Sequence, residues 1–258
     1  MTSDHILTSA QAGVLTVTIN RPEKLNAITP AMHTALAAAF DRFSADDALH
    51  VAIVTGAGSR AFCAGSDLGA FDAGSAYPAT GYAGLAERWD LAKPVIAAVN
   101  GLALGGGFEL ALACDLIVAA DSAVFGLPEP KLGLIAIGGG IHRLVQQAGL
   151  RRAMDALLTG RNLTAAEGLE HGFVNRVVGP DQVLPAAEAL AAEIIANAPL
   201  AVRLTKALAL WGLDQPTLAE AIAGQAAHPA FAKWRGAEDT AEGPRAFAEK
   251  RKPVWKGQ

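Results

Sequence analysis

The sequence predicts an α/β fold that ends in a helical region. Short apolar segments with strand character recur along the first three quarters of the chain, and helical segments stand between them. From Asp181 onward almost every segment has helical periodicity. Strands that alternate with helices indicate an α/β body. An all-helical tail after such a body often packs outward, against the body or against another subunit.

Turn and capping signals place the expected elements in chain order. The segment VLTVTIN alternates as a half-buried strand does, and it leads into the turn-rich stretch RPEKLNAI. Thr29 and Pro30 fit the N-cap and the first position of a helix that reaches about Phe43. A second helix is expected from the run GGFELALAC. The strands are expected at 14–20, 50–56, 94–101, 116–121 and 173–178.

The composition fits an ordinary globular protein. The chain has 258 residues, of which 52% are apolar and 18% charged, so it can bury a large core without disulfides or metals. A formal charge of −4 argues against a nucleic-acid binder. The two cysteines suit a reducing compartment. No signal peptide or membrane span is predicted, because the most apolar stretch is interrupted by Asn100, Glu109 and Asp115. We therefore expect a soluble cytoplasmic protein that binds neither nucleic acid nor membrane.

One carboxylate stands in an unusual setting. Glu109 follows a triple glycine and lies among Phe, Leu, Ala and Cys, so a helix over this run has no polar face and should be buried. Burial of an unpaired carboxylate is costly. The helix dipole lowers the pKa of Glu109 and desolvation raises it, and the sequence leaves open which effect is larger.

The glycines before this helix favour an anion-binding turn. Free amides at the start of a helix can stabilise a developing oxyanion, and Gly106 is a candidate for one of them. The second Gly-rich turn, FCAGSDL, offers the amide of Ser66. The alternative is that the glycines only permit close helix–strand packing, with Glu109 paired to an arginine.

A second carboxylate, Glu129, lies between Pro128 and Pro130 in an otherwise apolar segment. The two prolines predict a rigid loop that presents the side chain. Two carboxylates in apolar settings suit paired acid/base chemistry if they converge in space. An ordinary loop position for Glu129 stays open.

Taken together, these segments resemble the crotonase (enoyl-CoA hydratase/isomerase) superfamily, and the likeness extends over nearly the whole chain in the right order. The GFELALA and LPExKLG stretches look closer to the carnitinyl-CoA dehydratase branch than to the short-chain hydratase branch. The matching segments are RPEKLNAI (21–28), AFCAGSDL (61–68), KPVIAAVNGLALGGGFELALACDLIVAAD (93–121), FGLPEPKLGL (125–134), GGGIHRL (138–144), LTGRNLTAAEGLEHGFVNRVV (158–178) and RAFAEKRKPVWKG (245–257).

The resemblance implies a spiral of ββα units over 1–197 with the acyl-CoA site, and a C-terminal helical region over 198–258 that builds trimers or dimers of trimers. It implies an acyl-CoA thioester substrate, with no cofactor apart from the CoA of the substrate itself. The amides of Ser66 and Gly106 would hold the thioester oxygen. By analogy with family hydratases, Glu109 would deprotonate the water that attacks C3 and Glu129 would protonate C2.

The family also suggests where CoA is bound. The backbone of two segments would contact the pantetheine and adenine, and the basic C-terminal run would reach the CoA phosphates unless it is a solvated tail. The residues concerned are Lys24, Leu25, Ala27, Ala64, Asp67, Leu68 and Lys250. Phe71, Trp89 and Phe108 are candidates for the acyl pocket, although an aromatic residue in such a position more often belongs to the core.

Several positions depart from the family pattern where contacts with the acyl chain and water are expected. Gly69 and Ala70 replace a basic and acidic pair, Pro130 follows the glutamate directly, and Ala136 and Ile137 stand where many hydratases have Pro-Gly or Pro-Asp. These departures leave the physiological substrate open. The expected reaction is reversible hydration of a 2-enoyl-CoA, with a carnitinyl-CoA-type dehydratase or an enoyl-CoA isomerase as alternatives.

Other function classes fit the sequence less well. VAIVTGAGSRA contains a G-x-G-x-x-A stretch, but no helical run follows, as a dinucleotide-binding turn would require. No G-x-S-x-G elbow and no paired histidines occur, so neither a serine hydrolase nor a metal site is predicted. A non-catalytic acyl-CoA binder is the remaining alternative. The presence of both glutamates argues against it.

Overall fold

The computed structural model describes residues 4–70 and 77–257 and divides the chain into two compact units. The first unit comprises Met1–Trp89 and Val95–Ala191, and the second comprises Asp90–Pro94 and Ala192–Gln258. The α/β prediction is confirmed for the first unit, and the helical prediction for the second. The boundary at 197–198 and the oligomerisation role of the second part stay predictions.

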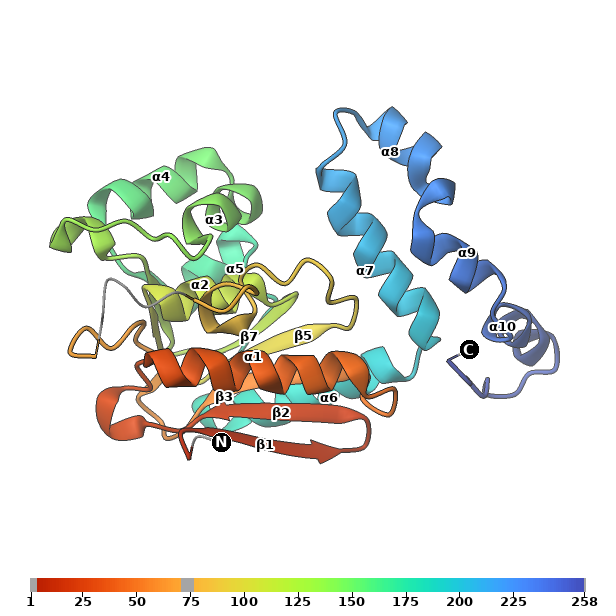
Figure 1. Cartoon of the computed structure of the whole chain (residues 1–258), viewed down its shortest axis with the longest axis horizontal. Coiled ribbons are helices and arrows are strands. Elements are labelled where there is room, and N and C mark those ends of the chain that lie inside the picture. Colours follow the sequence, from red (N-terminus) through yellow and green to blue (C-terminus); the bar gives the residue numbers. More distant parts are fainter. Residues whose placement is uncertain (1–3, 71–76, 258) are drawn as a thin grey trace. The chain divides into compact units, whose positions relative to one another are not determined.

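The larger sheet of the first unit begins with an antiparallel hairpin and continues in parallel order (Figure 1). Its strands lie in the order β1-β2-β3-β5-β7-β10, and β2 to β10 pair in parallel. The central strands β3, β5 and β7 are almost entirely buried, as expected for a parallel sheet covered on both faces. The bounds are β1 Ile6–Gln11, β2 Val14–Ile19, β3 Val51–Gly56, β5 Val95–Val99, β7 Leu116–Ala120 and β10 Arg176–Val178.

A smaller sheet has the order β4-β6-β8-β9. Its first three strands pair in parallel, and β9 joins antiparallel. Each repeat of the fold sends one strand to the larger sheet and the next to the smaller one, and the repeats β5-β6-α2 and β7-β8-α3 then add a helix. The expected ββα spiral is therefore present. The bounds are β4 Ala61–Cys63, β6 Leu102–Leu104, β8 Val124–Gly126 and β9 Leu163–Thr164.

The helices of the first unit bury apolar faces against these sheets. In α1 the buried side chains include Met32, Leu36, Phe40 and Phe43, which recur at helical spacing. Helix α1 lies beside the β1–β2 hairpin (Figure 1). The bounds are α1 Pro30–Ala45, α2 Gly106–Ala113, α3 Gly140–Ala148, α4 Leu150–Thr159, α5 Ala165–His171 and α6 Val183–Ile195, with short 3-10 turns η1 Pro22–Lys24, η2 Tyr82–Gly84, η3 Glu129–Leu132 and η4 Pro180–Gln182.

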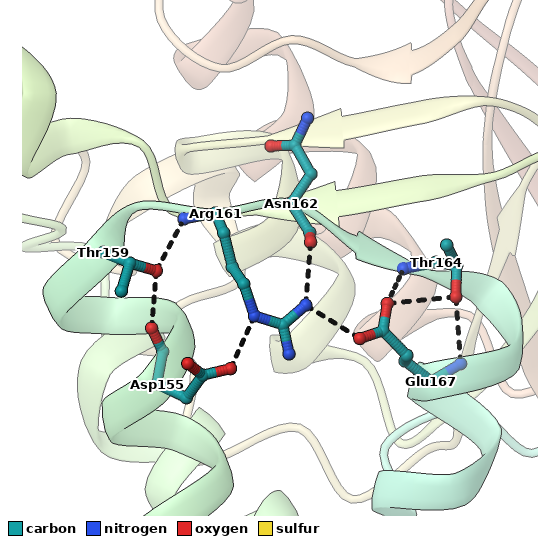
Figure 2. A network of polar contacts seen from close by, with 6 residues as sticks. All are labelled: Asp155, Thr159, Arg161, Asn162, Thr164 and Glu167. Atoms are coloured by element: carbon teal, nitrogen blue, oxygen red, sulfur yellow. Dashed lines mark hydrogen bonds and ion pairs between the residues drawn. The ribbon is translucent and has the colours of Figure 1, made fainter.

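A polar network fixes the corner between α4 and α5 (Figure 2). The Arg161 guanidinium contacts Asp155 at 2.5 Å and Glu167 at 2.7 Å. Thr164 caps α5 through its side chain, which accepts from the Glu167 amide at 3.1 Å, while the Glu167 carboxylate accepts from the Thr164 amide at 2.8 Å. This reciprocal capping box satisfies two amides that the helix itself leaves free.

The second unit is helical. Lys206 of α7 donates to the carbonyl of Lys93 at 3.0 Å, and Trp255 donates to the carbonyl of Ala196 at 2.8 Å. Within the described residues no single helix is long and apolar enough to cross a membrane, and only the broken pair Pro180–Ile195 with Pro199–Leu213 passes such a test when taken together. The bounds are α7 Pro199–Leu213, α8 Leu218–Gly224, α9 Pro229–Arg235 and α10 Asp239–Ala248, with η5 Gln225–Ala227.

The structure also decides how the weak dinucleotide-like stretch folds. After β3, residues 57–60 form a turn that leads directly into β4 rather than into a helix. The structure therefore lacks the strand–turn–helix context of a dinucleotide-binding fingerprint at this position. The segment around Glu129 is a 3-10 turn, in which Pro130 takes the second position.

Candidate active site

Two glycine-rich turns meet where the smaller sheet ends. Because β4 pairs with β6, the turn after Cys63 lies against the turn before α2. A Cβ on Gly65 would lie 3.0 Å from the carbonyl oxygen of Leu104 and 3.3 Å from the amide nitrogen of Gly106. Gly65 also has φ of 98°, so this position excludes other residues both sterically and conformationally.

The amides of Ser66 and Gly106 have no acceptor in the part of the chain that the structure describes. Ile28 pairs with this turn by accepting from Asp67 at 2.9 Å and by donating to Gly65 at 2.8 Å, which leaves the Ser66 amide outside the ladder. Gly106 is the first residue of α2, where amides lack an intrahelical partner. Within residues 4–70 and 77–257, neither amide donates a hydrogen bond. Both therefore keep their donor capacity for a ligand.

Glu109 is buried at the start of α2, with 3% of its surface exposed. Its Oε1 accepts from the amide of Gly140 at 2.9 Å, and the Gly138 amide also faces the carboxylate. The pKa of Glu109 is raised to about 7. Desolvation is the largest cause and the Glu129 carboxylate acts in the same direction, whereas the two amides and the Arg143 cation lower the pKa.

The alternative pairing of Glu109 with an arginine is not observed in the described part of the chain. Arg143 influences Glu109 through space, but its guanidinium donates to the carbonyl of Ala86 at 2.6 Å and lies over the Trp89 ring. The glycines Gly138 and Gly140 approach the carboxylate instead, because a Cβ on either would lie within 3.0 Å of a Glu109 side-chain atom. The GGG of residues 138–140 therefore encloses this acid.

Glu129 lies beside the same glycine turn. A Cβ on Gly105 would lie 2.9 Å from its Oε1. Its Oε2 is buried and has no hydrogen-bond partner among the described residues. Burial raises the pKa of Glu129. Glu129 thus lies beside Gly105, the N-cap of α2, and the Glu109 amide donates to the Gly105 carbonyl at 3.0 Å, so both acids adjoin the turn that carries the Gly106 amide.

Comparison with known proteins identifies the family. Residues 9–258 match the enoyl-CoA hydratase/isomerase family. The chain belongs to this family. A carnitinyl-CoA dehydratase from Salmonella arizonae is 45% identical, with 99% of each chain covered, and one from Proteus mirabilis is 42% identical over 99% of this chain and all of the relative.

Solved structures give the same answer for the fold. The crystal structure of an enoyl-CoA hydratase from Mycobacterium tuberculosis H37Rv superposes with a TM-score of 0.93, at 43% identity and with 99% and 100% of the two chains covered. That of an enoyl-CoA hydratase from Bacillus anthracis has a TM-score of 0.89 at 36% identity, with the same coverage. This chain therefore has the crotonase-type fold, and members of its family use CoA thioester substrates.

In this hydratase/isomerase family member, the two segments suggested for CoA lie side by side. Ala64 donates to the carbonyl of Leu25 at 3.0 Å, and the Arg21 guanidinium bridges to the Asp67 carboxylate at 2.6 Å. The buried Asn26 side chain accepts from the Arg21 amide and donates to the carbonyls of Ala57 and Ala61. Asn26 was not among the predicted site residues, yet its side chain fixes the loop that carries Lys24, Leu25 and Ala27.

Other site predictions have different outcomes. Leu68 is 62% exposed beside Asp67, and Lys250 lies after α10 in the second unit; their assignment to CoA stays a prediction. Arg251, part of the same basic run, is held by Glu242 and Glu249 at 2.6 Å each. At least one cation of the C-terminal basic run, Arg251, therefore forms ion pairs within the chain.

The acyl-pocket predictions for the aromatic residues are not supported. Phe108 has no exposed surface and packs in a cluster with Phe125 and Phe173, at ring centroid distances of 5.2 and 5.3 Å. Trp89 is 78% exposed and is covered by Arg143. Phe71 lies outside the described residues. The helical run around Phe108 points the ring into the core, on the face of α2 that carries no polar group.

Sequence reasoning missed one aromatic residue at the site. Tyr82 is 3% exposed, and a Cβ on Gly106 would overlap its ring and hydroxyl. Tyr82 lies in a stretch of glycine and alanine without a recognisable motif. The only signal in the sequence was the pair of glycines, Gly81 and Gly84, that flank it.

Proposed function

We propose that this protein is a hydro-lyase that adds water reversibly across the 2,3 double bond of a 2-enoyl-CoA thioester. The observation that carries the proposal is the buried Glu109 carboxyl and the half-buried Glu129 carboxyl beside a turn with free amides at Ser66 and Gly106. Desolvated acids with raised pKa values and nearby oxyanion donors are what thioester-activated proton transfer requires.

In the proposed hydration, one carboxylate takes a proton from water while the oxygen of that water bonds to C3 of the acyl group. The electrons of the C2–C3 bond move onto the thioester oxygen, and the amides of Ser66 and Gly106 stabilise the resulting enolate. The other carboxyl then donates its proton to C2, and the enolate collapses to the thioester. Dehydration follows the same steps in reverse.

The raised pKa of Glu109, about 7, supports a pair that holds a single proton near neutral pH. Two interacting carboxyls titrate together, and the state with one proton provides the acid and the base that the reaction needs. We assign the base to Glu109 and the acid to Glu129 by family analogy. The pH dependence of the rate therefore reports the titration of both carboxyls together and not that of either residue alone.

The remaining parts of the proposal concern the substrate and the assembly. CoA binds along the loops at Lys24–Ala27 and Ala64–Leu68, with Lys250 toward its phosphates, and the enzyme requires no cofactor or metal beyond the CoA of its substrate. We propose a cytoplasmic homotrimer or dimer of trimers. The relatives at 42–45% identity are named carnitinyl-CoA dehydratase, which favours a carnitinyl-CoA-type dehydration as the second candidate.

The test is turnover of a panel of 2-enoyl-CoA and 3-hydroxyacyl-CoA esters, carnitinyl-CoA included, followed through the absorbance of the conjugated thioester. We expect Glu109→Gln and Glu129→Gln each to lower kcat by about a hundredfold or more with nearly unchanged affinity for the CoA ester. The matched control is Glu170→Gln, an exposed carboxylate on α5, which should leave kcat unchanged.

Each outcome separates the candidates. Near-normal turnover by either site variant would remove that glutamate from the mechanism. Binding of CoA esters by the wild type without any turnover would favour a non-catalytic binder. Migration of the double bond without hydration would favour an isomerase.

A further inference from the structure

Tyr82 brings a phenol to the two residues whose amides are the candidate oxyanion donors. Its hydroxyl lies 3.5 Å from the Oγ of Ser66 and in direct contact with Gly106, where a Cβ would overlap the phenol carbon and oxygen. A separation of 3.5 Å between two hydroxyl oxygens is at most a weak hydrogen bond. Among the described residues the phenol has no stronger partner, so its donor capacity remains for a ligand.

The backbone around Tyr82 is held in an unfavourable conformation. Ala83 has φ of 53° and is buried, and it lies next to Gly84, with φ of 66°. A non-glycine residue in this region costs free energy and persists only where its surroundings enforce it. A Cβ on Gly84 would overlap the backbone of Ala37 in α1, so the turn is pressed against that helix.

A buried histidine fixes the same turn from the other side. The Nδ1 of His33, on α1, accepts from the amide of Ala83 at 2.9 Å. The imidazole ring also packs against Tyr82 edge-on at 4.6 Å, with Tyr77 at 5.0 Å from the imidazole. Burial lowers the pKa of His33 to about 4, so the ring is neutral at physiological pH and keeps a nitrogen that accepts. The direction of the Tyr82 ring is therefore set by its neighbours before any substrate arrives.

The surroundings also keep the phenol protonated. Burial raises the pKa of Tyr82 well above its usual value, and the nearby Glu109 carboxylate acts in the same direction. A phenol that retains its proton is a hydrogen-bond donor. A Cβ on Gly138 would lie 2.7 Å from the Glu109 Oε2 and 3.1 Å from the Cβ of Tyr82, so Tyr82 lies close to the buried acid.

We propose that Tyr82 is a third hydrogen-bond donor to the thioester oxygen, acting beside the amides of Ser66 and Gly106. The proposal deepens the proposed function and rests on it, because it assumes that these two amides bind that oxygen. A donor fixed in place before the enolate forms stabilises the developing charge without a reorganisation cost at the moment of reaction. The alternative is that the ring only fills space between α1 and α2.

The test compares Tyr82→Phe with Tyr77→Phe, which removes a phenol hydroxyl from the same aromatic cluster without touching Ser66 or Gly106. We expect Tyr82→Phe to lower kcat about 100-fold, at the lower end of the cost of losing one oxyanion donor, with little change in affinity for a CoA ester. The Tyr77→Phe protein should retain its kcat. A change in affinity alone would indicate a packing role and overturn the proposal.

A second measurement reads the hydrogen bond directly. The infrared band of a ¹³C-labelled thioester carbonyl is recorded for a 2-enoyl-CoA bound to the Glu129→Gln protein, which binds the ester with little turnover. Adding Tyr82→Phe should move the band back toward its frequency in free ester, whereas Tyr77→Phe should leave it unchanged. Fluorotyrosine at position 82, a stronger donor with the same shape, should move the band the other way. An unchanged band in both position-82 proteins overturns the proposal.

These outcomes are distinct from failure of the proposed function. If the wild type hydrates no 2-enoyl-CoA and dehydrates no 3-hydroxyacyl-CoA, the proposed function fails whatever the band does. If the wild type turns over its substrate while Tyr82→Phe changes neither kcat nor the band, only the role of Tyr82 is wrong.

Discussion

At the scale of single residues, the site depends on a buried carboxyl, Glu109, that forms no ion pair within the described residues. The sequence predicted the burial of Glu109 from its apolar neighbours, but it left open whether the helix dipole or desolvation has the larger effect on its pKa. In the structure desolvation has the larger effect, because α2 begins in the interior, where only amides and a distant guanidinium oppose it. Burial of Glu109 thus destabilises the fold when the carboxyl is charged, but it provides the raised pKa that the proposed reaction uses.

The cost of burying the charged Glu109 carboxylate predicts a pH-dependent gain in stability for Glu109→Gln. Folding raises the pKa of this carboxyl from 4.5 to about 7. The contribution of Glu109 to stability is therefore complete below about pH 4.5 and is lost as the pH rises through 7. One pH unit between these values corresponds to about 1.4 kcal/mol, so the loss reaches roughly 3 kcal/mol.

Since glutamine cannot ionise, Glu109→Gln should match the wild type near pH 4.5 and be more stable at pH 8. Urea unfolding at both pH values, at one protein concentration, measures the difference. Equal stability of the variant and the wild type at pH 8 would contradict the burial of a carboxyl with a raised pKa at this position.

Single residues also show which parts of the site could be predicted from the sequence and which could not. The glycines at 65 and 105–107 indicated the two turns, since a close approach or a positive φ leaves few alternatives. Phe108 was wrong as a pocket residue, because proximity to a motif does not fix the direction of a side chain, and a pocket role for the exposed Trp89 stays a prediction. Tyr82 was missed because its place at the turn results from packing between α1 and α2.

At the scale of elements, most of the longer strands and helices were predictable, as was the short β10 at Arg176–Val178 within the expected 173–178, whereas β1 and the strands of the smaller sheet were not predicted. The strands expected at 14–20, 50–56, 94–101 and 116–121 correspond to β2, β3, β5 and β7, whose apolar character is continuous or alternating. The strands of the smaller sheet have two or three residues each, too few for a period to be visible. That sheet positions the site, because the turns after β4 and β6 provide the amides.

The Arg161 network is an element-scale feature that we expect to be structural. Thr164→Ala removes the N-cap of α5, and it should lower the free energy of unfolding by about 1 kcal/mol while kcat stays unchanged. Denaturant unfolding and steady-state kinetics on the same preparation measure both. A tenfold loss of kcat would instead place this corner in the catalytic machinery.

At the scale of the whole molecule, the helical second unit leaves apolar side chains uncovered. Leu210 and Leu213 of α7 are 51% and 67% exposed, and Leu218 and Ile222 of α8 are 77% and 59% exposed. Large exposed apolar patches mark interaction surfaces. The first unit exposes apolar side chains as well, among them Ile135, Ile137 and Leu158. The exposed side chains on α7 and α8 support the proposal that this part of the chain assembles copies of the protein.

Accordingly, Leu213→Arg combined with Leu218→Arg should convert a trimer or hexamer to smaller species in light scattering, because charge at a desolvated apolar contact is costly. The control is Leu7→Arg on β1, where an exposed leucine lies in the other unit. Dissociation by the control, or an unchanged mass for the double variant, would place the interface elsewhere.

The most direct test of the account is a crystal structure of the Glu129→Gln protein with a bound 3-hydroxyacyl-CoA. We predict the thioester oxygen at about 2.7–3.1 Å from the amide nitrogens of both Ser66 and Gly106, with the C3 hydroxyl in contact with Glu109 and the C2 carbon facing residue 129. A thioester oxygen that contacts neither amide would contradict the account. So would an acyl chain whose C3 hydroxyl does not contact Glu109 and whose C2 carbon does not face residue 129.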